Sequence, residues 1–346
     1  MEISKRIEAF ARLGEAIRDF LGEEATPIYG ATLSAAVKRA SVVNPWFTEE
    51  FVRMALSSWA EVLTAEKLYS FVAGRKFSSQ KPRRVAVITA GNIPLVGFHD
   101  FLSVLISGNI FVGKLSSKDN ILLPALASVL IDLAPAFEGR IIFEKELLKN
   151  FDAVIATGSD NSARYFDYYF GKYPSVIRRN RSSVAVIHKG DGEAVYRELG
   201  KDIFYYFGLG CRSVSKIYVP EDFEFEPFMN ALNAFENIAE NTKYFNNYEY
   251  NKAVFLVNRT EHFDTGFLLL KEDESMSSAV ATLNFEYYEN EEALYRNLML
   301  QKHKLQCLVS SKFDGDIVVK PGKTQFPALT DWADGINILE FLEQLT

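Results

Sequence analysis

The chain has 346 residues, of which 48% are hydrophobic and 24% charged, and its 28 Phe and 16 Tyr make it rich in aromatic side chains. This composition is typical of a globular protein with one large or two ordinary domains and argues against disorder. The formal net charge of -7, without a long lysine or arginine stripe, argues against nucleic acid as a partner.

Hydrophobic residues at helical spacing mark the beginning of the chain. Ile3, Ile7 and Phe10 start a series with charged residues between its members, as in an amphipathic helix and unlike the apolar centre of a signal peptide. Residues 1–75 are expected to form a helical N-terminal region, in which Thr48 caps a helix. Every apolar stretch is too short to span a bilayer, so no transmembrane segment is expected.

The two cysteines, Cys211 and Cys307, are far apart and lie in different local contexts. This separation argues against a disulfide framework and a Cys-based zinc site, and a reducing cytoplasm is the expected location. The four histidines show no metal-ligand spacing, so no metal is expected. His99 follows the loop that contains Asn92 and could lie near a site there, but it is expected to be a satisfied helix histidine.

Three β-strand patterns from Lys81 onward end at small or polar residues before a helix-like segment. RRVAVITA leads into residues 91–94, NIFVGK into 115–117 and FDAVIAT into 158–160. The alternation predicts a parallel α/β sheet, whose strand ends and helix N-termini favour anionic ligands. A nucleotide site is therefore expected, although no GxGxxG follows these strands and a standard Rossmann dehydrogenase is disfavoured.

A second stretch, from about residue 183 to 331, predicts another α/β lobe. Its helix candidates are residues 226–241 and 291–301, and its strand candidates are SVAVIH, KIYVP, KAVFLV, AVATLNF and LQCLVSS. The predicted parts are a helical N-terminal region (1–75), a nucleotide-binding lobe (76–185), a catalytic lobe (186–331) and a C-terminal helix (332–346). No linker separates the lobes, and we place their boundary near residues 180–190.

Cys211 lies in the most distinctive local sequence, FGLGCRS, directly before a strand pattern. Glycines before it allow close approach of the backbone to a substrate, and the neighbouring Arg212 favours a reactive thiolate. A single cysteine is more often a small buried hydrophobe, which is the interpretation we give to Cys307. The local sequence alone does not identify Cys211 as catalytic, and this interpretation depends on the other segments of the chain.

Four segments in collinear order resemble the aldehyde dehydrogenase superfamily, in its branch of LuxC-like acyl-CoA reductases. VAVITAGNIPL resembles the family's strand followed by Trp-Asn-Phe-Pro, and VGKLSSKDN resembles its Lys-Pro-Ser-Glu. ATGSDNSA resembles its Phe-Thr-Gly-Ser, and FGLGCRSVSKIYV resembles its Gly-Gln-x-Cys before a strand. The similarity is good over residues 80–220, looser over 250–310 and only general before residue 75.

The resemblance implies an α/β fold of the aldehyde dehydrogenase type, with two α/β lobes and a helical N-terminal region. It makes Cys211 the nucleophile and Asn92 the amide donor of the oxyanion hole. It implies a cofactor site, with Lys114 on the ribose, at Lys114, Ser116, Ser117, Lys118, Gly158, Ser159 and Glu274. Of these, Glu274 aligns only loosely, and a solvated loop carboxylate remains an alternative for it.

Two departures from the hydrolytic members refine the expected reaction. Where those enzymes carry Glu-Leu-Gly-Gly-Lys, residues 178–183 are RRNRSS, so the glutamate that activates water is missing and transfer or reduction is favoured over hydrolysis. The three arginines either face CoA or NADP phosphates or form a solvated turn. Ser117 aligns with a cofactor-binding glutamate of the family and Lys118 follows it, and the lost negative charge and the added cation both favour NADP over NAD.

The predicted activity is an NADPH-dependent acyl-CoA reductase that forms an acyl-Cys211 thioester and releases an aldehyde. The alternatives are a Cys-dependent acyltransferase or thioesterase, an acyl phosphate reductase, and a non-enzymatic nucleotide-responsive scaffold. The expected partner is a small acyl-CoA substrate, and a homodimer is expected by analogy with the superfamily. Residues 322–335 are expected to be an ordered loop, for which a packing role is preferred over lining the substrate mouth or an interface.

Overall fold

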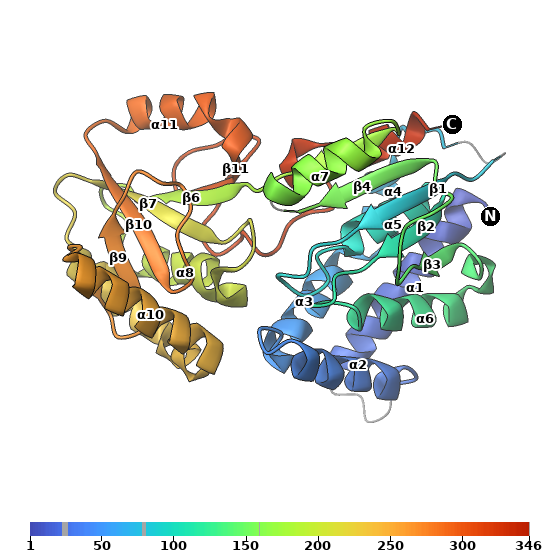
Figure 1. The fold of residues 1–346 in the computed structure, drawn as a ribbon, viewed down its shortest axis with the longest axis horizontal. Helices are drawn as coiled ribbons and strands as arrows, with labels where there is room; N and C mark the ends of the chain where they lie inside the picture. The colour runs from blue at the N-terminus through green and yellow to red at the C-terminus, as the bar shows by residue number, and fades with distance from the viewer. Residues whose placement is uncertain (23–26, 78–80, 159, 346) are drawn as a thin grey trace. The chain divides into compact units, whose positions relative to one another are not determined.

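The structure is a computed structural model that describes residues 1–22, 27–77, 81–158 and 160–345. The chain forms two compact units, each built around its own sheet (Figure 1). The first unit comprises Met1–Arg179 and Ala328–Thr346, and the second comprises Asn180–Pro327. Among the described helices, none combines the length and the apolar character needed to cross a membrane.

The N-terminal region is helical, as the sequence predicts. Its helices are α1 (Ile3–Leu21), α2 (Gly30–Val43), α3 (Glu49–Val62) and α4 (Ala65–Val72). The apolar stripe of α1 is buried, and the Phe10 ring lies edge-on to the rings of Phe101 and Phe137. Thr48 Oγ1 accepts a hydrogen bond from Phe51 N at 3.2 Å, which confirms Thr48 as the N-cap of α3.

Five parallel strands form the sheet of the first unit in the order β3-β2-β1-β4-β5. They are β1 (Arg84–Ile88), β2 (Ile110–Lys114), β3 (Ile141–Phe143), β4 (Ala153–Thr157) and β5 (Ser175–Arg178). The centres of β1, β2 and β4 are buried, because helices cover both faces of the sheet. The strand order reverses between β1 and β4, the kind of switch point where open α/β sheets bind ligands.

The helices that connect these strands lie on opposite faces of the sheet (Figure 1). α5 (Phe98–Ile106) follows β1, α6 (Leu122–Leu133) follows β2, and α7 (Asp160–Phe170) follows β4. α7 covers one face, while α1 and α6 lie on the other. A 3-10 turn, η1 (Pro135–Phe137), precedes β3, and the C-terminal segment adds η5 (Ala333–Gly335) and α12 (Ile338–Glu343), which packs on α5.

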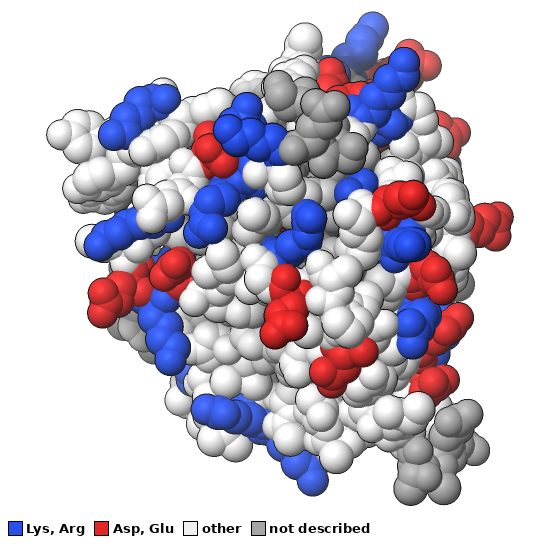
Figure 2. All heavy atoms as spheres, turned by 90° about the vertical axis from the view of Figure 1, so that its right-hand side faces the viewer, with Lys and Arg blue, Asp and Glu red and all other residues white. Residues whose placement is uncertain are grey.

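Acidic and basic side chains alternate over the face of the molecule in Figure 2. Neither sign gathers into a large continuous area on that face. Because opposite charges at short spacing cancel at a distance, the face presents no single-signed field to a polyanion.

The second unit has a seven-stranded sheet in the order β12-β11-β6-β7-β10-β9-β8. All neighbouring strands are parallel except β8 and β9. The strands are β6 (Ser182–Val186), β7 (Val214–Pro220), β8 (Phe263–Asp264), β9 (Leu269–Glu272), β10 (Thr282–Tyr288), β11 (Leu305–Ser310) and β12 (Val318–Val319). The α/β class predicted for both lobes is therefore confirmed.

The helices of the second unit differ from the sequence predictions in two places. They are α8 (Glu193–Phe204), α9 (Phe225–Leu232), α10 (Thr242–Asn258) and α11 (Glu291–Leu300), with 3-10 segments η2 (Tyr205–Gly208), η3 (Asn233–Glu240) and η4 (Lys302–Lys304). The predicted helix over 226–241 is split between α9 and η3. KAVFLV, predicted as a strand, lies within α10, so that prediction was wrong.

The misassigned segment has apolar residues on both faces of its helix. Tyr244 and Tyr248 of α10 are buried, yet Leu256 and Val257 are exposed. Six consecutive residues without a helical apolar stripe resemble a strand buried on both faces, because periodicity alone does not separate the two. These six residues are helical because they continue the helix that begins at Thr242.

Candidate active site

The turn after β1 carries Asn92 at the carboxyl edge of the first unit's sheet. Asn92 is exposed, whereas its neighbours Pro94 and Leu95 are buried. Leu95 has a left-handed backbone with φ of 59°, which is uncommon for a residue with a side chain. Its N–H donates to Asp119 Oδ2 at 2.8 Å. The neighbouring loop therefore holds the turn while the Asn92 side chain stays exposed.

The loop after β2 carries three predicted cofactor residues and packs against the Asn92 turn. Ser116 N donates to Thr89 Oγ1 at 3.3 Å, and Ser116 Oγ accepts from Lys118 N at 3.2 Å. A Cβ at Gly91 would lie 2.5 Å from Ser116 Oγ, so this close approach requires glycine. Ser117 and Lys118 are exposed. The structure thus brings Asn92 and these three predicted cofactor residues together at one edge of the sheet.

Lys114, at the end of β2, is tied to the segment that crosses from β3 to β4. Its Nζ donates to the main-chain oxygens of Lys145 and Glu146, the latter at 2.6 Å. Because an ammonium group has three donors, two bonds to the backbone leave one for a ligand. The predicted contact of Lys114 with a ribose is compatible with this geometry.

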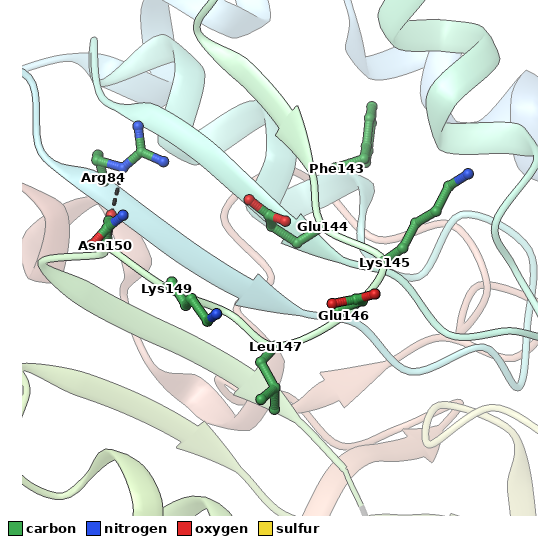
Figure 3. Close-up of a pocket in the computed structure, with 8 residues that line it drawn as sticks. All are labelled: Arg84, Phe143, Glu144, Lys145, Glu146, Leu147, Lys149 and Asn150. Carbon is green, nitrogen blue, oxygen red and sulfur yellow. Dashed lines mark hydrogen bonds between the residues drawn. The ribbon is translucent and has the colours of Figure 1, made fainter.

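The crossing segment lines a pocket of about 530 Å³ in the first unit (Figure 3). Such a volume lies within the range of small-molecule sites. Its lining is largely charged and polar, and consists of Arg84, Phe143, Glu144, Lys145, Glu146, Leu147, Lys149 and Asn150. Three of these residues are cations, a composition that suits a phosphate-bearing ligand despite the two carboxylates.

The third predicted strand end lies at the switch point of the same sheet. Gly158 follows β4, and its N–H donates to Arg178 O at 3.4 Å. Ser159 lies outside the described residues. The sequence prediction for this loop therefore rests on Gly158, which the fold places beside the end of β1.

Arg178 has neither of the roles that the sequence suggested for it. It is buried, and its guanidinium donates to both carboxylate oxygens of Asp100, at 2.7 and 2.8 Å. Such a bidentate pair fixes the end of β5 to helix α5. Arg179 is exposed and pairs with Asp167 at 3.0 Å. Arg178 is therefore not part of a phosphate-binding arginine cluster.

Cys211 lies in the second unit, on a turn that leads into β7. Its side chain is exposed, whereas Cys307 is buried in β11. Tyr206, Phe207 and Gly208 all have positive φ angles, of 54°, 57° and 71°. For the two aromatic residues this conformation costs on the order of 1–2 kcal/mol each. Both side chains are buried, and this burial offsets the local strain.

Hydrogen bonds fix the backbone around Cys211. Ser183 Oγ donates to Cys211 O at 2.9 Å and accepts from Cys307 N at 3.1 Å. Arg212 Nε donates to Thr324 O at 2.5 Å. Arg212, which follows Cys211, is thus anchored to residues 322–325, and this part of the chain has the packing role that the sequence predicts.

Asp202 of α8 organises that anchoring loop, although no local sequence pattern points to it. The side chain is buried and accepts from Gly322 N at 2.6 Å, Thr324 N at 3.0 Å and Thr324 Oγ1 at 2.8 Å. Burial raises the pKa of Asp202 to about 6, although the three hydrogen bonds act in the opposite direction. A buried carboxyl therefore supports the loop that holds Arg212.

The raised pKa of Asp202 predicts a pH-dependent contribution to stability. In the unfolded chain an aspartate has a pKa of about 3.9, so the folded protein binds the proton more tightly. The stabilisation that comes from protonated Asp202 is fully present below about pH 4 and is lost as pH rises through about 6. The free energy of unfolding changes by about 3 kcal/mol over this range. Urea titrations from pH 4 to 7.5 should show wild type losing this much relative to Asp202→Asn. Asp316→Asn, at an exposed position of the same unit, should track wild type, and parallel curves for all three proteins would contradict the prediction.

Glu274 lies on an exposed segment that the sheet of the second unit holds in place. Lys216 of β7 is fully buried, and its Nζ donates to Glu274 O at 2.8 Å and to Glu286 Oε2 at 2.5 Å. Ser215 Oγ also donates to Met276 O at 2.7 Å. The strand that follows Cys211 therefore fixes the backbone of the Glu274 segment.

Two histidines outside the predicted site have structural roles. His99 Nε2 contacts Leu329 O at 2.9 Å, and burial lowers the pKa of His99. His188 lies 2.7 Å from Ser310 Oγ and 3.1 Å from Glu291 Oε1, distances similar to those within a nucleophilic triad. However, Ser310 is fully buried and its Oγ accepts from two backbone N–H groups. It caps the turn after β11.

The predicted site residues thus fall into two groups. Asn92, the loop after β2 and Gly158 lie at the carboxyl edge of the first sheet, while Cys211 and Glu274 belong to the second unit. Sequence reasoning missed Asp119 and Asp202, whose hydrogen bonds shape the turns that carry Asn92 and Cys211. Among the described residues, no group of three or more His, Cys, Asp or Glu could hold a metal ion.

Comparison with known families and proteins gives a consistent match. Residues 70–268 match the family model described as acyl-CoA reductase (LuxC). The long-chain acyl-protein thioester reductase of Vibrio harveyi is 24% identical over 211 residues, which cover 56% of this chain and 43% of that protein. The protein of that name from Photorhabdus laumondii is 25% identical over 175 residues, or 45% and 36% of the two chains. These matches span less than half the length of either relative.

Solved structures show the same fold. Aldehyde dehydrogenase 21 from Physcomitrella patens superposes with a TM-score of 0.65 at 12% identity, covering 90% of this chain and 74% of that one. A Mycobacterium tuberculosis aldehyde dehydrogenase complexed with NAD+ gives 0.62 at 15% identity, covering 86% and 70%. The fold predicted from the sequence motifs is therefore confirmed.

Proposed function

Because the chain belongs to the acyl-CoA reductase (LuxC) family, we propose that it reduces an acyl thioester to an aldehyde through an acyl group carried on Cys211. The observation that carries this proposal is the exposed thiol of Cys211, which follows a strained segment at residues 206–208 and has a hydrogen-bonded backbone, inside the matched region. A buried thiol in a relaxed loop would argue for the packing role that is common for cysteine.

Acyl transfer to Cys211 is the first step of the proposed reaction. The thiolate attacks the carbonyl carbon of the donor thioester, the bond from that carbon to the donor sulfur breaks, and the donor leaves as a thiol after taking up a proton. Negative charge develops on the carbonyl oxygen. We assign its stabilisation to the backbone N–H of Cys211 and the side-chain amide of Asn92.

The residues of the first unit fit a dinucleotide with an additional phosphate. Bound NADPH would supply the hydride that reduces the acyl-Cys211 thioester. We assign its binding to Lys114, Ser116, Ser117, Lys118, Gly158 and Ser159, with Glu274 from the second unit. Neither Ser117 nor Lys118, both of which are exposed, is a carboxylate that would repel a 2′-phosphate, and the neighbouring pocket has three cations against two carboxylates.

The acyl donor is proposed to be a fatty acyl thioester, with coenzyme A as the carrier. The relatives from Vibrio harveyi and Photorhabdus laumondii are named for an acyl-protein substrate, so an acylated protein is the second donor to compare. We also propose a cytoplasmic location and, by analogy with the superfamily, a homodimer.

The proposed function is tested by following both halves of the reaction in one assay. The protein is mixed with acyl-CoAs of increasing chain length and with NADPH or NADH, while CoA release, cofactor oxidation and intact protein mass are measured. We expect an acyl adduct of Cys211, NADPH oxidation in step with CoA release, and a slower rate with NADH.

Each alternative gives a different result in this assay. Release of CoA without cofactor oxidation would identify an acyltransferase or thioesterase, and turnover of an acyl phosphate but not of the matching thioester would identify an acyl phosphate reductase. If neither an adduct nor turnover appears with CoA or protein-bound donors, the proposed function is wrong.

A further inference from the structure

A buried carboxylate, Asp119, joins the two loops that carry the proposed site residues of the first unit. It is 7% exposed and lies in the loop after β2, next to Lys118. Its Oδ2 accepts from Leu95 N at 2.8 Å, and its own N–H donates to Ser116 O at 3.1 Å. The cofactor loop and the Asn92 turn are therefore connected through one side chain.

The Asn92 turn is held at both of its ends. On one side Gly91 packs against Ser116, where a Cβ would lie 2.5 Å from Oγ. On the other side Leu95 has φ of 59°, and its N–H is the group that Asp119 binds. Since a left-handed leucine persists only where its surroundings enforce it, loss of the Asp119 bond would free this end of the turn.

Stability of the fold does not account for this carboxylate. Its second oxygen, Oδ1, has no hydrogen-bond partner among the described residues although it is buried. Burial raises the pKa of Asp119 to about 6, and the Leu95 bond lowers it only in part. A buried carboxylate with one unpaired oxygen is costly, because the water that it lost is not replaced. A role in setting the turn explains why it is tolerated.

We propose that Asp119 is a positioning residue that holds the Leu95 backbone and thereby sets the Asn92 amide for acyl transfer to Cys211. The inference rests on the proposed function and adds a residue that acts through Asn92 without touching the substrate. The neutral amide of Asp119→Asn still accepts from Leu95 N through its oxygen. It should therefore preserve part of the effect, since a bond to a charged acceptor is about twice as strong as a neutral one.

The test measures acylation of Cys211 by intact mass, without cofactor, at varied acyl-CoA concentration. Asp119→Ala is expected to slow the maximal acylation rate by on the order of 10- to 100-fold with little change in the half-saturating concentration, as for other small misplacements of a reacting group. Asp119→Asn should fall between Asp119→Ala and wild type. In an Asn92→Ala background, Asp119→Ala should change the rate by less than about threefold, because both act through one amide.

A matched control separates positioning from general loosening of the fold. Asn109 is equally buried at the opposite edge of the sheet, and its Oδ1 accepts from Arg83 N at 2.9 Å. Asn109→Ala should keep the wild-type acylation rate, and urea unfolding should show how far each variant is destabilised. If Asp119→Ala does not fold, Asp119→Asn replaces it in the cycle with Asn92→Ala.

Three results would overturn the assignment of Asp119. They are wild-type acylation by a folded Asp119→Ala, equal slowing by Asn109→Ala, and full additivity with Asn92→Ala. A wild-type protein that forms no adduct with either acyl-CoA or an acylated protein donor would instead overturn the proposed function itself. The two failures are therefore distinguishable within one set of measurements.

Discussion

Replacing Cys211 by serine is expected to abolish the acyl adduct and to lower reductase activity by at least about three orders of magnitude. The attacking species is a thiolate, and a serine hydroxyl, which ionises far less readily than a thiol, is a much weaker nucleophile at neutral pH. Losses of this size are typical when the nucleophile of a covalent mechanism is removed. The measurement is intact mass after mixing with acyl-CoA, together with NADPH oxidation.

Cys307 provides the matched control for this substitution. Its thiol is buried in β11, and its backbone N–H takes part in the Ser183 bridge to Cys211. Because the substitution leaves that N–H in place, Cys307→Ala should keep the adduct and most of the activity while losing some stability. An adduct that persists in Cys211→Ser and disappears in Cys307→Ala would show that the nucleophile had been assigned to the wrong cysteine.

Replacing Asn92 by alanine is expected to reduce kcat by on the order of 100- to 1000-fold, the usual effect of removing one oxyanion donor. The half-saturating concentration of acyl-CoA should change little, because the amide acts on charge that develops only in the transition state. The measurement is the acylation rate from single-turnover mixing at saturating donor.

Asn120, an exposed asparagine in the next loop, offers a comparison of the same chemistry. Asn120→Ala should acylate at the wild-type rate. Acylation by Asn92→Ala within about threefold of wild type would remove Asn92 from the oxyanion hole and leave the Cys211 backbone N–H as the proposed donor.

Much of the fold follows from short-range patterns that need no knowledge of distant contacts. The apolar spacing that begins with Ile3, Ile7 and Phe10 predicts α1, and Thr48 predicts the start of α3. The β-branched runs predict most strands of both sheets, because parallel strands buried on both faces are almost wholly apolar. The same criterion wrongly predicted a strand for KAVFLV, because α10 is apolar on two sides and its sequence looks like that of a buried strand.

Less of the candidate site than of the fold can be predicted from the sequence. Motif order singles out Asn92 and Cys211, but nothing near Asp119 or Asp202 in the sequence marks a carboxyl that binds backbone N–H groups. Asp202 meets its partner Thr324 across 122 positions of the chain. Arg178 was misjudged for the same reason, because Asp100 lies 78 residues away. Partners at such separations are set by topology, which local pattern does not reveal.

The left-handed stretch at Tyr206, Phe207 and Gly208, which precedes Cys211, depends on aromatic packing in the interior of the second unit. The Phe207 ring lies 5.9 Å from that of Tyr244, on α10. Tyr206 and Phe207 keep this unfavourable backbone conformation only while their rings are buried in the interior. Looser packing of these rings would therefore let the backbone relax and would shift the position of the Cys211 sulfur. The position of the Cys211 thiol therefore depends on the packing of aromatic side chains in the interior of the second unit.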